Sequence, residues 1–176
     1  IYAQDLLNEE PGAKVVGEVK CSEVLYDQIR IWGGVPIMSR VGHSFIKKTL
    51  IDEDALLAGE MSGHMFLADR YFGYDDAIYA GARLLEIFSR KGRKVSELLA
   101  DVPKTYNTPE IRVDCPERHK FEVVKEMKQF FSQEYSTVTV DGVRVLFEDG
   151  WGLVRASNTQ PVLVLRFEAL SQKRLE

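Results

Sequence analysis

The feature that most constrains the fold of this 176-residue chain is a change of pattern a little beyond its midpoint. Before that point, strand-like apolar segments alternate with helix-like amphipathic ones, and the strand-like segments are Lys14–Lys20, Val35–Ser39 and Ala55–Ala58. Strands that alternate with helices at this spacing are typical of βαβ units, in which neighbouring strands run parallel. We therefore predict an α/β domain with a mixed, largely parallel sheet for the first part of the chain.

The second part of the chain has a different pattern. Residues 102–109 (VPKTYNTP) are typical of a linker. A strand and a helix follow, and then short strand-like segments are separated by Asp141-Gly142 and by Asp149-Gly150. Asp-Gly pairs between alternating strands are strong hairpin signals. We predict an α+β domain with an antiparallel sheet here, and domains that comprise residues 1–108 and 109–176.

Two long helices are expected, one in each part of the chain. The first is predicted over Asp76–Arg90, with Asp75 as its N-cap, and its apolar residues recur with helical periodicity. These periodic residues are Ile78, Ala82, Leu85 and Phe88. The second helix is predicted between Pro116 and Gln133. The residues expected to face inward from it are Phe121, Val124, Met127, Phe130 and Phe131.

Bulk properties make some classes of partner less favourable. A net charge of −4 argues against nucleic-acid binding, and the apolar runs are too short to span a bilayer. No signal-peptide pattern is present at Ile1. A cytoplasmic protein is expected, because free thiols suit a reducing compartment. Cys21 and Cys115 form no CxxC pair and are predicted to be buried free thiols. Because Ile1 opens inside a helix-like segment and Glu176 stops inside another, we interpret the sequence as a piece of a longer protein.

The loop Gly59–His64 gathers polar side chains directly after a predicted buried strand. Glu60 is suited to accept from a pair of hydroxyls, Ser62 to donate or accept, and His64 to move a proton near neutral pH. A tight turn with solvated polar residues is the alternative interpretation. Ligands of parallel sheets sit beyond the carboxyl ends of the strands, which is where Lys20, His43 and Glu60 all fall.

A second polar loop lies almost a hundred residues later, between two predicted strands. Residues 155–159 (RASNT) supply a guanidinium, two hydroxyls, an amide and several backbone N–H groups, and Pro161 stiffens the exit. A fork donor with short donors around it is what a phosphate dianion needs. A hairpin loop with incidental polar residues is the alternative. The chain shows no Walker loop, no GxGxxG and no metal-ligand cluster, and His119 is predicted to be a surface residue.

These two loops and the segments around them resemble the α-D-phosphohexomutase superfamily. The matching stretches include GEMSGHMF, RYFGYDDAIYAGARLLEIFS, TPEI, DGVRV and GWGLVRASNTQPVLVLRFEA, and VKCS and VGHSFIKK also fit. The resemblance covers almost the whole chain and is closest to the bacterial phosphomannomutase/phosphoglucomutase members. It implies an intramolecular phosphotransferase of carbohydrate metabolism, classed as an isomerase, that moves a phosphate between the 1- and 6-positions of a hexose. The reaction passes through a hexose 1,6-bisphosphate.

The resemblance also implies roles for individual residues. Glu60 and Ser62 would bind the O3 and O4 hydroxyls of the sugar, Lys20 and His43 would contact the bound sugar phosphate, and His64 is either a general acid/base or a structural imidazole. The implied phosphate-binding residues are Arg155, Ser157, Asn158 and Thr159. The catalytic phosphoserine loop and the magnesium-binding aspartate loop of the family match no segment of this chain.

The resemblance therefore implies that the chain is the third domain and most of the fourth domain of a phosphohexomutase, with magnesium bound elsewhere in the full-length phosphoprotein. Its partners would be the phosphosugar substrate and the N-terminal domains of the same protein, and we expect this piece to be inactive alone. A phosphoglucosamine mutase and a non-catalytic sugar-phosphate binding module are the alternatives.

Overall fold

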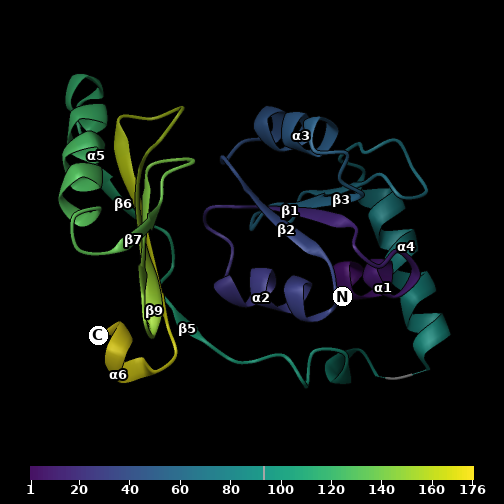
Figure 1. The fold of residues 1–176 in the computed structure, drawn as a ribbon. Helices are drawn as coiled ribbons and strands as arrows, with labels where there is room; N and C mark the ends of the chain where they lie inside the picture. The colour runs from purple at the N-terminus through teal and green to yellow at the C-terminus, as the bar shows by residue number, and fades with distance from the viewer. Residues whose placement is uncertain (93) are drawn as a thin grey trace. The chain divides into compact units, whose positions relative to one another are not determined.

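The computed structural model describes residues 1–92 and 94–176. They form two compact units, which comprise residues 1–103 and 104–176, and each has its own sheet. In Figure 1 the first unit runs from purple to teal and the second from green to yellow.

The first unit is built on a four-stranded sheet with the order β2-β1-β3-β4. The strands are β1 (Lys14–Glu18), β2 (Val35–Ser39), β3 (Leu57–Gly59) and β4 (Met65–Leu67). The central strand β1 runs parallel to β2 and to β3, whereas β4 returns antiparallel to β3 as the second strand of a hairpin. The prediction of a mixed, largely parallel sheet is confirmed.

Helices cover both faces of this sheet (Figure 1). They are α1 (Tyr2–Glu9), α2 (Glu23–Ile31), α3 (His43–Asp52) and α4 (Ala77–Lys91), and a short 3₁₀ helix follows at Val95–Glu97. Because successive side chains of a strand point to opposite faces, Val15 and Val16 enter different cores. Val15 packs with residues of α1 and α2 such as Leu7 and Ile29, and Val16 packs with Ile46 of α3.

The second unit is an antiparallel sheet with the order β5-β10-β9-β8-β7, and β6 pairs with β10 as well. The strands are β5 (Tyr106–Asn107), β6 (Ile111–Asp114), β7 (Ser136–Val138), β8 (Val143–Phe147), β9 (Gly150–Ala156) and β10 (Val162–Ala169). The helix α5 (Glu117–Phe131) packs on β7 to β10, and the single turn α6 (Gln172–Leu175) follows β10. The prediction of an α+β unit with an antiparallel sheet is confirmed.

The start of α4 differs from the prediction. Its N-cap is Asp76, whose side chain accepts from the backbone N–H of Tyr79, whereas Asp75 lies before the helix. Asp75 instead forms an isolated antiparallel bridge with Phe66 of β4. The apolar period is helical as predicted, but Ile78 and Leu85 are exposed. The buried face of the helix carries Ala80, Arg83 and Ile87.

The buried face of α5 also differs from the prediction. Phe121 and Phe130 were expected to face inward, yet 57% and 61% of their surfaces are exposed. Val124, Met127 and Phe131 are half-buried. They follow position 120 at steps of four, three and four residues, which places them on the same face of the helix as that residue. The residue that begins this stripe is Lys120, which is only 1% exposed. The buried face of α5 therefore includes the charged residue Lys120, whereas Phe121 and Phe130, which were expected there, lie on the exposed side.

Two further expectations concern the cysteines and the membrane. Cys21 and Cys115 are both buried free thiols, which confirms the prediction. Among the helices of the described residues, none has the length and the apolar character that crossing a bilayer requires.

Candidate functional site

The loop Gly59–His64 is the turn of the β3–β4 hairpin. Gly59 pairs with Met65, the backbone N–H of Glu60 donates to the carbonyl of His64 at 3.0 Å, and that of Gly63 donates to the carbonyl of Glu60 at 2.9 Å. Gly63 has a φ of +94°, which favours glycine at this position. The two ends of the turn are thus fixed by backbone hydrogen bonds, and the side chains from position 61 to position 64 are exposed.

A buried carboxylate connects this turn to the end of β1. Glu18 has no exposed surface, and its Oε2 accepts from the backbone N–H of Lys20 at 2.6 Å. Its Oε1 accepts from the backbone N–H of Met61 at 3.3 Å. Burial raises the pKa of Glu18, although these two N–H donors and the Lys20 charge oppose the shift. Glu18 therefore connects Lys20 to the Glu60–His64 turn. Lys20 and residues of this turn were predicted as ligand-binding candidates, whereas Glu18 was not.

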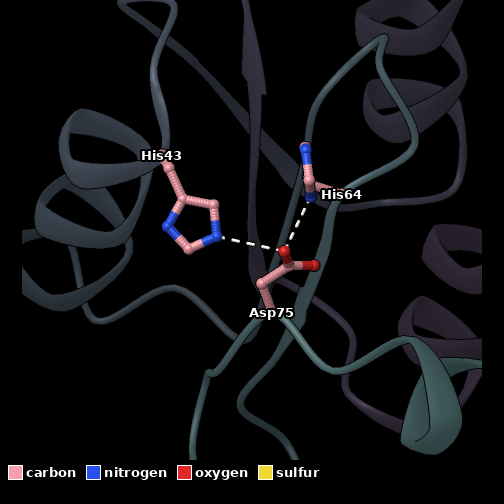
Figure 2. Close-up of side chains that lie close together, drawn as sticks. All are labelled: His43, His64 and Asp75. Atoms are coloured by element: carbon pink, nitrogen blue, oxygen red, sulfur yellow. Dashed lines mark hydrogen bonds and ion pairs between the residues drawn. The ribbon is translucent and has the colours of Figure 1, made fainter.

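Asp75 brings His43 and His64 together (Figure 2). Its Oδ2 lies 2.7 Å from Nδ1 of His64 and 3.1 Å from Nε2 of His43. Its Oδ1 accepts from the backbone N–H of Met65 at 3.3 Å. His43 is the first residue of α3, and His64 closes the hairpin turn, so one carboxylate links two separate segments. About half of each imidazole is exposed, which leaves both rings accessible to a ligand.

The protonation of this cluster follows from the shared carboxylate. Partial burial acts to raise the pKa of Asp75, but the hydrogen bonds from His43 and His64 outweigh it, so the pKa lies below its ordinary value. An ionised carboxylate only accepts, so His64 donates through Nδ1–H and His43 through Nε2–H. The other nitrogen of the His64 ring points away from Asp75 in Figure 2. In the neutral ring that Nε2 atom carries a lone pair and is available to receive a proton.

Among the described residues, the side chains of His43, His64 and Asp75 form a group whose geometry suits a metal ion. One ligand atom from each of His43, His64 and Asp75 lies within 4.8 Å of the others. This cluster was not predicted from the sequence, because its residues come from three segments with no recognisable spacing. Two nitrogens and one oxygen are typical of zinc and other transition-metal sites, whereas magnesium prefers an all-oxygen octahedron.

The second polar loop joins β9 to β10 and comprises Ser157–Pro161. Asn158 and Thr159 are exposed in it. Ser157 is buried, and its Oγ accepts from the backbone N–H groups of Thr159 at 3.3 Å and of Gln160 at 3.2 Å. Its hydroxyl therefore shapes the loop from within, while the exposed side chains remain available to a ligand.

Arg155 lies just before this loop, on β9, and its side chain is only 5% exposed. Its Nε donates to Oδ2 of Asp141 at 3.0 Å, in a buried ion pair across the sheet. Its Nη2 is buried and has no hydrogen-bond acceptor within the described part of the chain. A buried guanidinium N–H without an acceptor is costly, and an anion bound at this end of β9 would supply the acceptor.

The structure thus groups the residues selected from the sequence in two sets. In the first unit, Glu18 and Asp75 connect the segments that carry Lys20, His43, Glu60, Ser62 and His64. In the second unit, Arg155 and the adjoining loop carry Ser157, Asn158 and Thr159. Glu18 was not selected from the sequence because it follows apolar residues within a strand. Asp75 was not selected because it had been predicted to be the N-cap of a helix.

Comparison with known proteins assigns both units. Residues 1–106 match the family model "Phosphoglucomutase/phosphomannomutase, alpha/beta/alpha domain III", and residues 110–176 match "Phosphoglucomutase/phosphomannomutase, C-terminal domain". The chain is 49% identical to a phosphoglucomutase of Neisseria gonorrhoeae, over all of this chain and 39% of that protein. It is 46% identical to a phosphomannomutase/phosphoglucomutase of Pseudomonas putida, over all of this chain and 38% of that protein.

Solved structures agree. A phosphoglucomutase/phosphomannomutase family protein of Burkholderia thailandensis superposes with a TM-score of 0.88 at 42% identity, covering 99% of this chain and 37% of that one. The chain therefore spans about two fifths of the length of these relatives. Since the two family models together cover nearly all of the sequence, the chain belongs to the phosphoglucomutase/phosphomannomutase family, of which it represents domain III and the C-terminal domain.

Proposed function

We propose that this chain recognises the sugar and one phosphate group in a phosphohexomutase that interconverts hexose 1-phosphates and hexose 6-phosphates. The observation that carries the proposal is the hairpin turn at residues 60–64. It places a carboxylate, a hydroxyl and an Asp75-bound imidazole within five residues at an exposed position. Membership in the phosphoglucomutase/phosphomannomutase family supports the choice of a phosphosugar as ligand.

Glu60 and Ser62 are proposed to bind adjacent hydroxyls of the hexose ring. The Ser62 hydroxyl donates to Oε2 of Glu60 at 3.3 Å, so the two side chains already lie together. Oε1 of Glu60 is shielded from solvent and receives no hydrogen bond from the described residues. A sugar hydroxyl would supply the missing donor. Because glucose and mannose differ only at O2, a carboxylate that binds O3 and O4 serves both sugars.

His64 is proposed as the general acid/base for the sugar hydroxyl that gains or loses the phosphate. Its Nδ1–H is held by Asp75, which fixes the tautomer and leaves Nε2 to exchange a proton with a hydroxyl oxygen. His43 and Lys20 are proposed to contact the sugar phosphate. Lys20 contributes charge from the end of β1, and His43 contributes a half-exposed imidazole from the start of α3.

Arg155, Ser157, Asn158 and Thr159 are proposed to form the site for the phosphate that is not transferred. The buried Nη2 of Arg155 supports this role, because a phosphate oxygen would give it the acceptor it lacks. Holding one phosphate places the opposite end of the sugar toward the phosphoryl donor. Since either end can be held, the bisphosphate intermediate would turn over between the two half-reactions.

The magnesium ion of the proposed reaction does not suit the residues described here. In the described part of the chain, the one cluster with metal-ligand geometry offers two imidazole nitrogens and one carboxylate oxygen, whereas magnesium selects oxygen ligands. No magnesium ligand is therefore assigned among the described residues. The phosphoserine and the magnesium ligands of the proposed enzyme would belong to other domains, and the chain alone is expected to bind without turnover.

The test is a titration of the ¹⁵N-labelled chain with glucose 1,6-bisphosphate. The amide signals of residues 155–159 are expected to shift, and those of residues 59–64 more weakly. A Thr159→Val variant, which removes one exposed hydroxyl from the loop, is expected to weaken the response, and Thr105→Val serves as the matched control. Shifts confined to residues outside both loops would contradict the assignment, and so would conversion of mannose 1-phosphate by the chain alone.

A further inference from the structure

A lysine of α5 lies buried against the loop that joins β9 to β10. Lys120 is 1% exposed, and its Nζ donates to the backbone carbonyls of Ser157 at 2.7 Å and of Gln160 at 3.1 Å. The same atom lies 2.7 Å from Oε2 of Glu117. An ammonium group has three N–H donors, and here three acceptors satisfy all of them. This side chain therefore makes specific contacts with the two ends of one loop.

These contacts determine what the loop presents to solvent. The carbonyls of Ser157 and Gln160 flank Asn158 and Thr159, which are exposed. A carbonyl oxygen repels an anion, and both carbonyls are engaged by the buried ammonium instead of facing solvent. The hydroxyl of Ser157 fixes the backbone of the same turn from within. The side of the loop that faces solvent is therefore cleared of two groups that would oppose a phosphate.

The charge of Lys120 acts in the same direction. The ammonium is buried, whereas 69% of the Glu117 side chain is exposed. Solvent screens an exposed charge more strongly than a buried one, so the carboxylate only partly cancels the field of the ammonium. The ammonium of Lys120 therefore contributes positive potential beneath the loop, although the loop residues Ser157–Pro161 carry no charged side chain.

We propose that Lys120 is a positioning residue for phosphate binding at the loop Ser157–Pro161, through its hold on two carbonyls and through its buried charge. This inference rests on the proposed function of that loop. It assigns Lys120 no contact with the ligand. It accounts for a buried lysine on the inner face of α5, where an apolar side chain would otherwise pack.

The experiment compares Lys120→Met with Lys125→Met in the whole 176-residue chain. Both substitutions remove one positive charge from α5, but Lys125 is exposed. Each variant is titrated with glucose 1,6-bisphosphate at a temperature at which the Trp151 indole signal shows the second unit to be folded. The loop amides of Lys120→Met are expected to report affinity about tenfold weaker than wild type, which corresponds to ~1.4 kcal/mol. Lys125→Met is expected to bind like wild type.

The outcomes separate this inference from the proposed function. If the wild-type loop does not respond to the bisphosphate, the proposed function of the loop fails. If the wild type responds and a folded Lys120→Met variant binds equally well, the positioning role alone is overturned. A purely structural lysine would lower the stability of the unit without changing the affinity of the folded fraction.

A measurement on the unmutated chain applies if Lys120→Met does not fold. The ¹⁵Nζ ammonium signal of Lys120 is expected to be protected from solvent exchange and to shift as the bisphosphate saturates the loop. The Lys125 signal is expected to show neither effect. A Lys120 signal that stays unchanged at saturation would overturn the proposal.

Discussion

At the scale of single residues, two carboxylates organise the polar side chains of the first unit. Glu18 accepts from the backbone of Lys20 and Met61, and Asp75 accepts from His43 and His64. Each connects segments that are distant in the sequence. The ligand-binding candidates therefore depend on residues that would contact no ligand themselves.

Glu18 is expected to make the stability of the chain depend on pH. Its pKa in the folded state lies above the ordinary value of 4.5, so the folded state binds more protons than the unfolded state between these two pKa values. The contribution of Glu18 is therefore fully present below pH 4.5 and is lost as the pH rises through the raised pKa. Urea unfolding should show the stability of wild type relative to Glu18→Gln falling as the pH rises across this window. A difference that grows with pH would contradict the prediction.

His64 is expected to affect turnover more than folding. In a full-length protein that contains this chain, His64→Asn should lower kcat by about 10²- to 10⁴-fold, the usual contribution of a general acid/base. The KM should change little, because Glu60, Ser62 and the phosphate loop remain. His119→Asn is the control, since this half-exposed imidazole pairs with Glu122 on α5. Loss of thermal stability with an unchanged kcat would identify His64 as a structural imidazole.

Sequence reasoning found the exposed ligand-binding candidates but missed the residues that hold them. Glu60, Ser62 and Thr159 could be selected from the sequence because they lie in loops marked by glycine or other turn-forming residues. The long-range contacts of Glu18 and Lys120 reach partners 37 to 43 residues away, and the two histidines that Asp75 contacts are 11 and 32 residues away. No local pattern encodes such contacts. A charged residue in an otherwise buried position of a strand or helix is the signal that would have found Glu18 and Lys120.

At the scale of elements, the turn before β8 is a sterically restricted connection in the second unit. Gly142 has a φ of +78°, and a Cβ there would lie 2.3 Å from the carbonyl oxygen of Val154 on β9. The neighbouring residue, Asp141, forms the buried ion pair with Arg155. The turn therefore supports the pairing of β8 with β9, and it holds Arg155, which is proposed to bind the phosphate, in position.

Gly142→Ala is expected to destabilise the second unit by about 2 kcal/mol or more, since it combines left-handed strain with a backbone clash. Gly12→Ala is the matched control: Gly12 has a similar φ of +84° but open space around its Cβ position. The indole signals of Trp32 and Trp151 report the two units separately during urea unfolding. Earlier loss of the Trp151 signal is expected for Gly142→Ala, and equal effects of the two substitutions would contradict the steric argument.

Element boundaries and types were largely predictable, whereas helix faces were not. The Asp-Gly pairs correctly indicated the turns before β8 and β9, because few residues suit such turns. The cap of α4 was misplaced by one residue because Asp75 and Asp76 are equivalent as caps in sequence, and only the bridge of Asp75 to β4 separates them. The face of α5 was misjudged because phenylalanine was assumed to face inward, although Lys120 does.

At the scale of the whole molecule, the change of pattern along the sequence predicted two kinds of sheet, and both are present. The spacing of strands and helices limits how a chain can connect neighbouring strands, so fold class follows from local patterns. Strand order in the second unit was not predictable. β10 lies between β9 and the pair β5 and β6, and this depends on side-chain packing across the whole sheet.

The pairing of β10 with β5, β6 and β9 has a consequence for synthesis on the ribosome. All strands of the first sheet have been made by Leu67, whereas the second sheet lacks the strand that joins β5 and β6 to β9 until Ala169 has been added. At roughly 5–20 residues per second, the interval between these points lasts on the order of 5–20 seconds. During it, β6, α5 and β7 to β9 emerge without the strand that joins them. The nascent second unit therefore cannot complete its sheet until β10 has been made, so its folding depends on non-local contacts.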